Sequence, residues 1–296
     1  MLDRLLAPDS TLSRRFFFLA RRFVPGATIG AAIEAVRALN ASGMTATLDF
    51  LGEDVVEHPA ALQTRDVYLS MIDAIRASQL QCNLSVKLTA LGLLIGEDFA
   101  LKNLTDILQY AQKHAADPFV RIDMEGSTVT EATLRVFERA YERYANVGPV
   151  FQAYLKRTPD DVERAIALRA RVRLCKGAYQ EPPEIAIKSM PAIREQYLKC
   201  AQGLLTAGNY PGIATHDRRL HRAIKRFCAE HAIAPDRFEF QMLYGVRPAM
   251  QRELIAQGYR LRIYVPFGTH WAGYFYRRVA ERRENAVFAL SSIFSR

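Results

Sequence analysis

The chain has 296 residues, of which 50% are hydrophobic and 24% are charged, so it has the composition of a soluble globular protein with one large or two smaller domains. Its 40 Lys and Arg residues outnumber 31 Asp and Glu residues, and the formal net charge of +9 favours anionic surfaces or small anionic ligands as partners. The basic residues alternate with acidic ones and form no single block, which argues against nucleic acid as a partner.

The N-terminal segment LSRRFFFLARRF, residues 12–23, combines four arginines with an apolar face. This pattern is typical of a helix that lies on a membrane surface, and equally of an N-terminal helix packed on the protein body. The apolar run FFFLA is too short for a secretory signal, and no run approaches the roughly 20 residues of a membrane-spanning helix. We therefore predict a helical N-terminal arm over residues 1–40, in a protein that is soluble or peripheral to a membrane.

From residue 44 onward, short β-type runs alternate with amphipathic helical patterns. The expected strands are 44–50, 82–88, 119–124, 149–155, 171–177, 210–216, 237–243 and 259–265. The expected helices are 59–79, 100–115, 130–144, 159–170, 191–207, 217–231 and 247–257, with Pro159 and Asp217 as start signals of two of them.

Eight such alternations predict a (βα)8 barrel of the TIM type, formed by a single catalytic domain over residues 41–296. A doubly wound sheet is the alternative. It usually carries a glycine-rich phosphate-binding turn, and the chain contains no GxGxxG motif.

The cysteines and histidines show no metal-binding pattern. Cys82, Cys175, Cys200 and Cys228 are far apart and lack CxxC spacing, so we expect reduced, mostly buried thiols of a cytoplasmic protein. HxH and HExxH motifs are absent, and no metal site is expected.

Polar side chains lie at the C-terminal ends of seven consecutive expected strands, where barrel enzymes build their active sites. In chain order they are Lys87; Asp123, Met124 and Glu125; Gln152, Tyr154 and Lys156; Arg173, Lys176 and Gly177; Thr215, His216 and Asp217; Gln241 and Leu243; and Tyr264. Buried charges are costly unless they are paired or used, so this run predicts a site at the barrel mouth.

For some of these strand-end residues, a purely structural role remains an alternative. Lys87 can extend its amine from a strand end toward solvent, Asp123 can simply pair with Lys87 on the neighbouring strand, and His216 can be a core histidine bonded to the backbone. The remaining histidines have no partner pattern and are expected to be surface or structural residues: His58, His114, His221, His231 and His270.

A helix is expected after the last strand, in the segment YFYRRVAERREN that begins at Tyr274. Tyr274, Arg278 and Glu281 fall on one stripe of this helix, with Arg277 on its flank. Glu281 can reach both arginines, which then form either a surface ion-pair network or a guanidinium pair oriented toward a carboxylate ligand.

Several motifs in order resemble those of proline dehydrogenases over roughly residues 40–290. They are LSVKLTALGL, RIDMEGS, QAYLKRT, RLCKGAYQEP, IATHD, FEFQMLYG and RIYVPFGTHWAGYFYRRVAERREN. The resemblance is to the monofunctional bacterial form. It implies a distorted (βα)8 barrel that binds FAD non-covalently at the strand ends, with the last helix over the barrel mouth.

The resemblance also implies roles for single residues. Asp123 and Lys87 match an active-site pair, and Arg173 matches an arginine near flavin N5. Arg277 and Arg278 match a clamp for the proline carboxylate that Glu281 orients, while Tyr264 and Leu243 match contacts to the substrate. The residues that fall in FAD-contacting motifs are Met124, Gln152, Arg173, Lys176, Gly177, Ala178, Thr215 and His216.

The sequence departs from the family pattern at two places. Ala272 and Gly273 replace bulkier residues at the start of the last helix, which puts its rigidity in doubt, and Cys175 replaces an aliphatic residue.

The implied reaction is oxidation of L-proline to 1-pyrroline-5-carboxylate by hydride transfer from C5 to flavin N5, with a membrane quinone as electron acceptor. This is the first step of proline catabolism to glutamate, in the cytoplasm or at the inner face of the membrane. Two alternatives remain open from the residues alone: a Schiff-base lyase or aldolase with Lys87 or Lys176 as nucleophile, and a non-catalytic membrane-surface protein.

Overall fold

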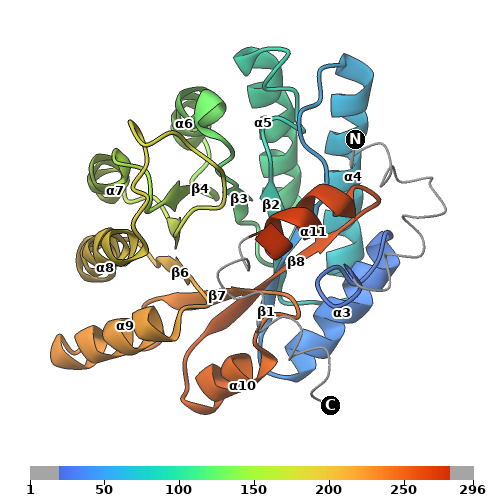
Figure 1. Ribbon diagram of the computed structural model, residues 1–296. Helices are drawn as coiled ribbons and strands as arrows, with labels where there is room; N and C mark the ends of the chain where they lie inside the picture. The colour runs from blue at the N-terminus through green and yellow to red at the C-terminus, as the bar shows by residue number, and fades with distance from the viewer. Residues whose placement is uncertain (1–19, 281–296) are drawn as a thin grey trace.

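The protein is a closed barrel of eight parallel strands surrounded by helices (Figure 1). The structure, a computed structural model, describes the backbone of residues 20–280 and the side chains of residues 20–275. The strands are β1 (Thr45–Phe50), β2 (Cys82–Val86), β3 (Val120–Ile122), β4 (Val147–Gln152), β5 (Arg173–Cys175), β6 (Gly212–Ala214), β7 (Glu239–Leu243) and β8 (Leu261–Phe267). The helices are α3 (Ile29–Ala41), α4 (His58–Ala77), α5 (Glu97–His114), α6 (Ser127–Tyr141), α7 (Thr158–Ala167), α8 (Met190–Ala207), α9 (Arg218–Glu230), α10 (Pro248–Ala256) and α11 (Trp271–Ala280).

This topology confirms the predicted (βα)8 barrel. Each strand pairs in parallel with the next one along the chain, and β8 pairs with β1, so the alternative of an open doubly wound sheet is wrong. The helix start signals are confirmed as well: the carboxylate of Asp217 accepts from Arg219 N and caps α9, and Pro159 lies in the first turn of α7.

The observed strands are shorter than the predicted ones, most clearly β5. It was expected over 171–177 and spans only Arg173–Cys175. The chain leaves the sheet at Gly177, which has φ +121°, and a Cβ there would lie 2.1 Å from the ring of Tyr154. Glycine is therefore required at this turn, and regular pairing ends before it.

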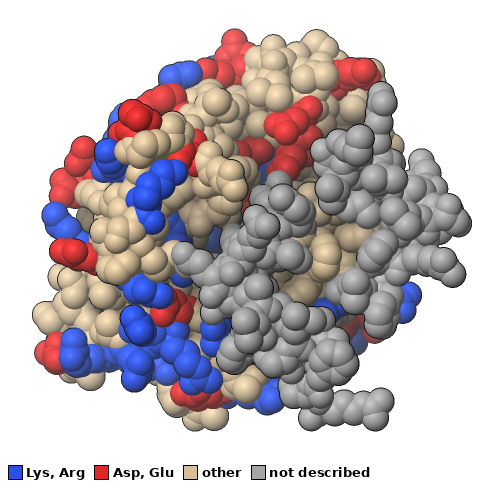
Figure 2. Space-filling view, in the orientation of Figure 1, with Lys and Arg blue, Asp and Glu red and all other residues tan. Residues whose placement is uncertain are grey.

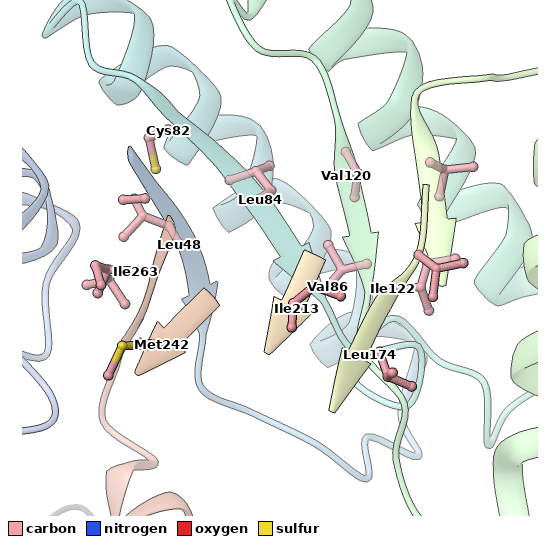
Figure 3. Close-up of a cluster of buried hydrophobic side chains, with 14 of the residues drawn as sticks. Leu48, Cys82, Leu84, Val86, Val120, Ile122, Leu174, Ile213, Met242 and Ile263 are labelled. Atoms are coloured by element: carbon pink, nitrogen blue, oxygen red, sulfur yellow. The ribbon is translucent and has the colours of Figure 1, made fainter. Parts of the chain in front are cut away.

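The two faces of the barrel strands differ in polarity. Apolar residues at alternate positions form the main hydrophobic core; Figure 3 shows Leu48, Leu84, Ile122, Leu174 and Ile263 among them. The intervening positions carry polar side chains that bond across the barrel between strands that are not neighbours, as Arg173 on β5 does to Ser85 on β2. The helices thus bury an apolar outer face, and the barrel interior is polar.

The last helix lies over the C-terminal end of the barrel. In the described residues of α11, Trp271 and Tyr274 are buried in a second apolar cluster with Phe23, with Val24 and with Leu51, which directly follows β1. The partly buried side chains of this cluster include Val246, just after β7, and Tyr264 of β8. The position of the last helix over the mouth is therefore confirmed.

Helix α3 covers the last part of the predicted N-terminal arm and ends one residue beyond it. Its buried residues Ile33, Val36 and Leu39 belong to the main core, and α3 contacts β1 and β8. Residues 1–19 lie outside the described part of the chain, and the division into an arm of residues 1–40 and a barrel of residues 41–296 stays a prediction.

The four cysteines are free thiols. Burial raises the pKa of Cys200 and of Cys228 to about 11, so both are protonated and unreactive at neutral pH. Over the described residues, no helix is long and apolar enough to cross a membrane.

Candidate active site

Asp123 is the centre of a hydrogen-bonded group at the barrel mouth. Its Oδ1 accepts from Arg173 Nη1 at 2.7 Å and from Ser85 Oγ at 2.7 Å, and its Oδ2 accepts from the Tyr264 hydroxyl at 2.8 Å. These partners come from β2, β5 and β8, so the barrel brings together residues up to 141 positions apart in the chain. Arg173 is 6% exposed, and such a buried guanidinium requires the carboxylate partner.

Tyr264 joins this group by its ring as well as by its hydroxyl. The Arg173 Cζ atom lies 5.3 Å from the centroid of the Tyr264 ring, within the range of a cation–π contact. Burial, together with the nearby carboxylates of Asp123 and Asp49, raises the pKa of Tyr264 well above its usual value. The phenol is therefore a neutral hydrogen-bond donor at physiological pH.

Lys87 pairs with Asp49 of β1 and not with Asp123. Its Nζ lies 2.9 Å from Oδ1 and 2.8 Å from Oδ2 of Asp49, whose side chain is fully buried. The suggested pairing of Asp123 with Lys87 is wrong, because β1 supplies a carboxylate beside Lys87 and β5 supplies a cation beside Asp123. Asp49 was missed at the sequence level, although a carboxylate inside the apolar run MTATLDF was a visible signal.

In the Lys87–Asp49 pair, burial disfavours the charged form of each group, and the charge of its partner favours it. Desolvation favours a neutral Lys87, but the carboxylates of Asp49, Asp123 and Glu125 outweigh it and raise the pKa of Lys87. Burial raises the pKa of Asp49 to about 6, against the stabilising charge of Lys87. Lys87 is therefore positively charged at neutral pH and is unsuited to act as an amine nucleophile.

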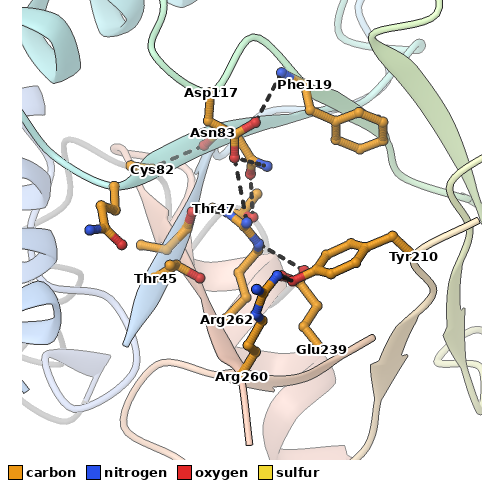
Figure 4. Close-up of polar contacts among 12 residues, drawn as sticks. Thr45, Thr47, Cys82, Asn83, Asp117, Phe119, Tyr210, Glu239, Arg260 and Arg262 are labelled. Carbon is orange, nitrogen blue, oxygen red and sulfur yellow. Dashed lines mark hydrogen bonds and ion pairs between the residues drawn. The ribbon is translucent and has the colours of Figure 1, made fainter. Parts of the chain in front are cut away.

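A buried polar chain leads from Arg173 toward the N-terminal end of the barrel. Arg173 Nε donates to Gln241 Oε1 at 2.5 Å, Gln241 Nε2 donates to Glu239 Oε1 at 2.6 Å, and Arg262 donates to the same Glu239 oxygen at 2.8 Å. Figure 4 shows the part of this network near the N-terminal ends of the strands, where Arg262 Nη2 also donates to Asp117 Oδ2 at 3.4 Å. The mouth and the base of the barrel interior are therefore connected by hydrogen bonds.

Glu125, which follows Asp123 and Met124, links three loops of the mouth through Thr89. Its carboxylate accepts from Thr89 N at 3.1 Å and from Thr89 Oγ1, and the same Thr89 oxygen accepts from Asp54 N at 3.0 Å. Burial raises the pKa of Glu125 to about 7, against the two hydrogen bonds from Thr89. The link between the loops after β1, β2 and β3 thus depends on a carboxyl group that titrates near neutral pH.

The predicted cofactor residues lie together around the ends of β3 to β6. Gln152 donates to Glu125 O at 3.1 Å and accepts from Ala178 N at 3.4 Å, so its amide joins the loops after β3 and β5. Lys176 Nζ lies 3.8 Å from Asp217 Oδ2. Met124 and Thr215 are buried, Gly177 makes the turn described above, and His216 Nε2 accepts from Leu243 N at 2.9 Å.

The donors at this part of the mouth fit the diphosphate of a dinucleotide. Lys176 keeps 30% of its side chain exposed, and α9 begins directly after Thr215, His216 and Asp217, with Arg218 and Arg219 exposed in its first turn. Cations and a helix N-terminus are the groups that bind a diphosphate. Figure 2 shows Lys and Arg side chains gathered over α9 and α10, whereas basic and acidic side chains are interspersed over the rest of the described surface on this face.

The loop after β5 is fixed to α6 by Glu181. Helix α6 begins after Gly126, which has no side chain to cap it, and the buried carboxylate of Glu181 accepts from Ser127 N at 2.8 Å instead. Lys188 Nζ donates to the backbone oxygen of Glu181, and Ile187 N donates to Tyr154 O at 2.7 Å. The loop that carries Gly177 and Ala178 is therefore anchored at several points.

Other predicted residues are only partly placed by the structure. Arg277 and Arg278 lie in α11, but their side chains lie outside the described part of the chain, and so does Glu281. His221 has the structural role expected of it: its ring is buried, and Nε2 bonds to Thr215 O at 2.9 Å. In residues 20–275, no group of three or more His, Cys, Asp or Glu side chains is arranged to hold a metal ion.

The family of the chain follows from comparison with known sequences. The sequence model described as proline dehydrogenase matches residues 32–290, which include every strand of the barrel. The chain belongs to the proline dehydrogenase family. It is 42% identical over 277 residues to proline dehydrogenase 1 of Bacillus subtilis subsp. natto, covering 94% of this chain and 91% of that relative.

Further relatives extend this result. The chain is 37% identical over 285 residues to a proline dehydrogenase of Deinococcus radiodurans, covering 95% of this chain and 91% of the relative. Among solved structures, proline utilization A (PutA) from Bdellovibrio bacteriovorus inactivated by N-propargylglycine superposes with a TM-score of 0.85 at 25% identity. That match covers 93% of this chain but 34% of the PutA chain, so the fold here corresponds to about a third of the longer protein.

Several residues of the site were not assigned from sequence. Asp49, Ser85 and Glu239 alternate with apolar residues in their strands, which marks them as facing the barrel interior once the outer face is known. Gln241 was noted at a strand end without a role. The alternation was visible in the sequence, but the partner of each residue depends on which strands face each other across the barrel.

Proposed function

We propose that the protein oxidises L-proline to 1-pyrroline-5-carboxylate with FAD as hydride acceptor and a membrane quinone as final electron acceptor. The observation that carries this proposal is the Asp123–Arg173–Tyr264 group beneath α11, in a chain that belongs to the proline dehydrogenase family. Bound FAD would supply the acceptor for the hydride from C5 of the substrate.

The substrate would be held between the charged barrel mouth and the last helix. Arg277 and Arg278 follow Tyr274, which anchors α11 in the apolar cluster over the mouth. Two guanidinium groups at this place would bind the proline carboxylate, with Glu281 one turn further orienting them. Lys87 after β2, Leu243 at the end of β7 and Tyr264 in the middle of β8 would line the opposite side.

The electrostatics of the mouth support binding of the neutral-amine form of proline. Lys87 and Arg173 are both cations fixed by carboxylates, and two further arginines would lie above them. A secondary ammonium is disfavoured among fixed cations, so the site would favour loss of the amine proton that hydride removal requires. Arg173 would stabilise negative charge that develops on the reduced cofactor.

FAD would be held by residues around the ends of β4 to β6. Gln152, Ala178 and His216 would supply polar groups to the flavin, while Lys176 and the N-terminus of α9 would bind the diphosphate. The exposed basic side chains of α9 and the basic segment 12–23 would give the protein affinity for anionic lipid, near the quinone.

A Schiff-base mechanism through Lys87 is not favoured. Asp49 keeps the Lys87 amine charged and raises the pKa of Lys87, whereas a nucleophilic lysine needs a lowered pKa.

The visible spectrum of the purified protein tests the proposal, recorded before and after anaerobic addition of L-proline. We expect a flavin spectrum that bleaches on addition of proline and not of D-proline. A flavin that ignores L-proline would refute the substrate, and a protein that neither contains nor binds FAD would refute the cofactor.

The clamp needs a separate variant. Arg277→Ala/Arg278→Ala should raise KM for L-proline by about 100-fold or more, because each charge-assisted hydrogen bond contributes about 1.5–3 kcal/mol. Arg76→Ala/Arg139→Ala, at exposed positions of α4 and α6, serves as the control for loss of two positive charges alone. An unchanged KM in the double variant would rule out the carboxylate clamp.

A further inference from the structure

Gln241 separates two buried charged groups inside the barrel. It lies on β7 and is 4% exposed, with Arg173 and the mouth on one side and Glu239 on the other. The charged or titratable groups packed around Gln241 and Glu239 are Arg173, Arg262, Arg121 and Tyr210. No other neutral side chain in the described residues bonds to both Arg173 and Glu239.

The two neighbours of Gln241 permit one orientation of its amide. Arg173 only donates hydrogen bonds, so it must face the amide oxygen, and the carboxylate of Glu239 only accepts, so it must face the amide nitrogen. Both bonds are short, at 2.5 Å and 2.6 Å. An amide meets both requirements at once, and an ionised carboxylate at this position meets only one.

The bond from Gln241 fixes the plane of the Arg173 guanidinium. Nε is bound by Gln241, while Nη1 is bound by Asp123 and by Ser85. Two nitrogens held from two directions leave the planar group little freedom to rotate. Without the Gln241 bond, Arg173 would keep only its contacts through Nη1 and its ring contact with Tyr264.

Gly212 on the neighbouring strand β6 makes room for this amide. A Cβ built on Gly212 would lie 2.4 Å from Gln241 Nε2 and 2.9 Å from Gln241 Cδ. The backbone of Gly212 is otherwise that of a regular strand residue, paired with Glu239 of β7. The absence of a side chain at this position is therefore explained by the Gln241 amide.

We propose that Gln241 is a positioning residue for the reaction: its neutral amide, accommodated by Gly212, holds the guanidinium of Arg173 in the orientation that faces the bound cofactor and Asp123. The proposal rests on the function given above. It assigns the role to hydrogen-bond polarity, and not to the volume of the side chain.

Gln241→Glu separates these two possibilities in the FAD-loaded enzyme. The new carboxylate would lie against Glu239, and two adjacent carboxylates share one proton at an elevated pKa. While that proton is bound, the donor and acceptor pattern of the amide is kept; when it leaves, the added charge draws Arg173 away from Asp123. We expect the ratio of wild-type to variant kcat to increase about tenfold between about pH 6 and about pH 9, with a change in KM below about threefold.

Two readouts do not depend on turnover. The flavin midpoint potential of Gln241→Glu should become more negative than that of the wild type as pH rises, because reduced flavin loses the positioned cation. The unfolding free energy of the FAD-free variant should fall relative to the wild type over the same pH range. Gln241→Met, which keeps the volume, should lower kcat by a factor that does not depend on pH.

Gly212→Ala gives an independent test without a new charge. It should lower kcat in the wild-type background and have little further effect in a Gln241→Ala background, because the displaced group is then absent. Gly203→Ala is the matched control, since a Cβ there meets no atom closer than 3.8 Å.

Equal losses from Gly212→Ala in both backgrounds, or a wild-type to Gln241→Glu ratio that is the same at every pH, would overturn the positioning role. A wild-type flavin that L-proline does not reduce would instead refute the proposed function.

Discussion

The mouth and the base of the barrel interior contain the same kinds of charged residues under different constraints. At the base, Glu239 accepts from Arg262 and from Gln241, and these partners outweigh burial so that the pKa of Glu239 is lowered. At the mouth, burial dominates, and the pKa values of Asp49 and Glu125 are raised to about 6 and about 7. The partners of Glu239 at the base thus favour its charged form, whereas burial of Asp49 and Glu125 at the mouth opposes theirs.

This difference indicates where the fold serves stability and where it serves chemistry. At the base, Arg262 and Glu239 form a buried ion pair in which each charge has its partner, as Figure 4 shows. At the mouth, the partners of Asp49 and Glu125 do not offset the effect of burial, so the pKa values of both carboxyl groups stay raised. Groups with perturbed pKa values are concentrated at functional sites. Substitutions at the two ends should therefore separate loss of stability from loss of activity.

The largest expected effect is on stability, at the base. Arg262→Leu leaves Glu239 buried without its counter-charge, and breaking one partner of a buried ion pair costs about 3–5 kcal/mol. Urea unfolding of the variant and the wild type measures this loss. A destabilisation below about 1 kcal/mol would show that the base does not depend on this pair.

The next effect is on activity, at the mouth. Asp123→Asn keeps the shape of the side chain but removes the charge that holds Arg173, and we expect kcat/KM for L-proline to fall by about 100-fold or more. The unfolding free energy should change less than in Arg262→Leu. Steady-state kinetics together with urea unfolding check both parts, and a variant with full activity would remove Asp123 from the reaction.

A smaller effect concerns the pH dependence of stability. The pKa of Glu125 is raised in the folded state to about 7, so the protonated group favours folding. This contribution to stability is lost as the pH rises from about 4.3, the pKa of the group in the unfolded chain, through 7. Glu125→Gln should therefore become more stable relative to the wild type as the pH rises, with an upper limit of about 1.4 kcal/mol for each pH unit between the two pKa values.

Unfolding curves at several pH values between about 5 and about 8 measure this trend. Glu131→Gln on the exposed face of α6 is a suitable control. A difference between wild type and Glu125→Gln that is independent of pH would mean that Glu125 does not titrate in this range.

The smallest effect is expected at Arg121, a buried arginine of the base without a carboxylate partner in the described residues. Its Nη1 donates to Pro149 O at 3.0 Å, and burial together with Arg173 and Arg171 lowers its pKa well below the usual value. Arg121→Leu should change the unfolding free energy by less than about 1 kcal/mol, or increase it, because well-packed apolar residues often replace buried charges without loss. A loss as large as that of Arg262→Leu would show that backbone hydrogen bonds, and not ion pairing, hold the base together.

The sequence by itself determined the repeat of strands and helices, and therefore the barrel, because periodicity and start signals such as Pro159 and Asp217 are local properties. It also predicted that Asp123, Arg173 and Tyr264 lie together at the barrel mouth, because parallel strands bring their C-terminal ends to one side. Only Asp123 directly follows its strand, however, since Arg173 begins β5 and Tyr264 lies in the middle of β8.

Only the tertiary structure decided which of these residues meet. Lys87 bonds to Asp49 because β1 pairs with β2 in the sheet. Asp123 bonds to Arg173 and Tyr264 because the closed barrel turns residues of β5 and β8, neither of which is a neighbour of β3, toward the same interior. Strand length was likewise decided in three dimensions, where Gly177 turns against the ring of Tyr154 and ends β5. Pairing depends on distances between residues far apart in the chain, and no local pattern encodes those distances.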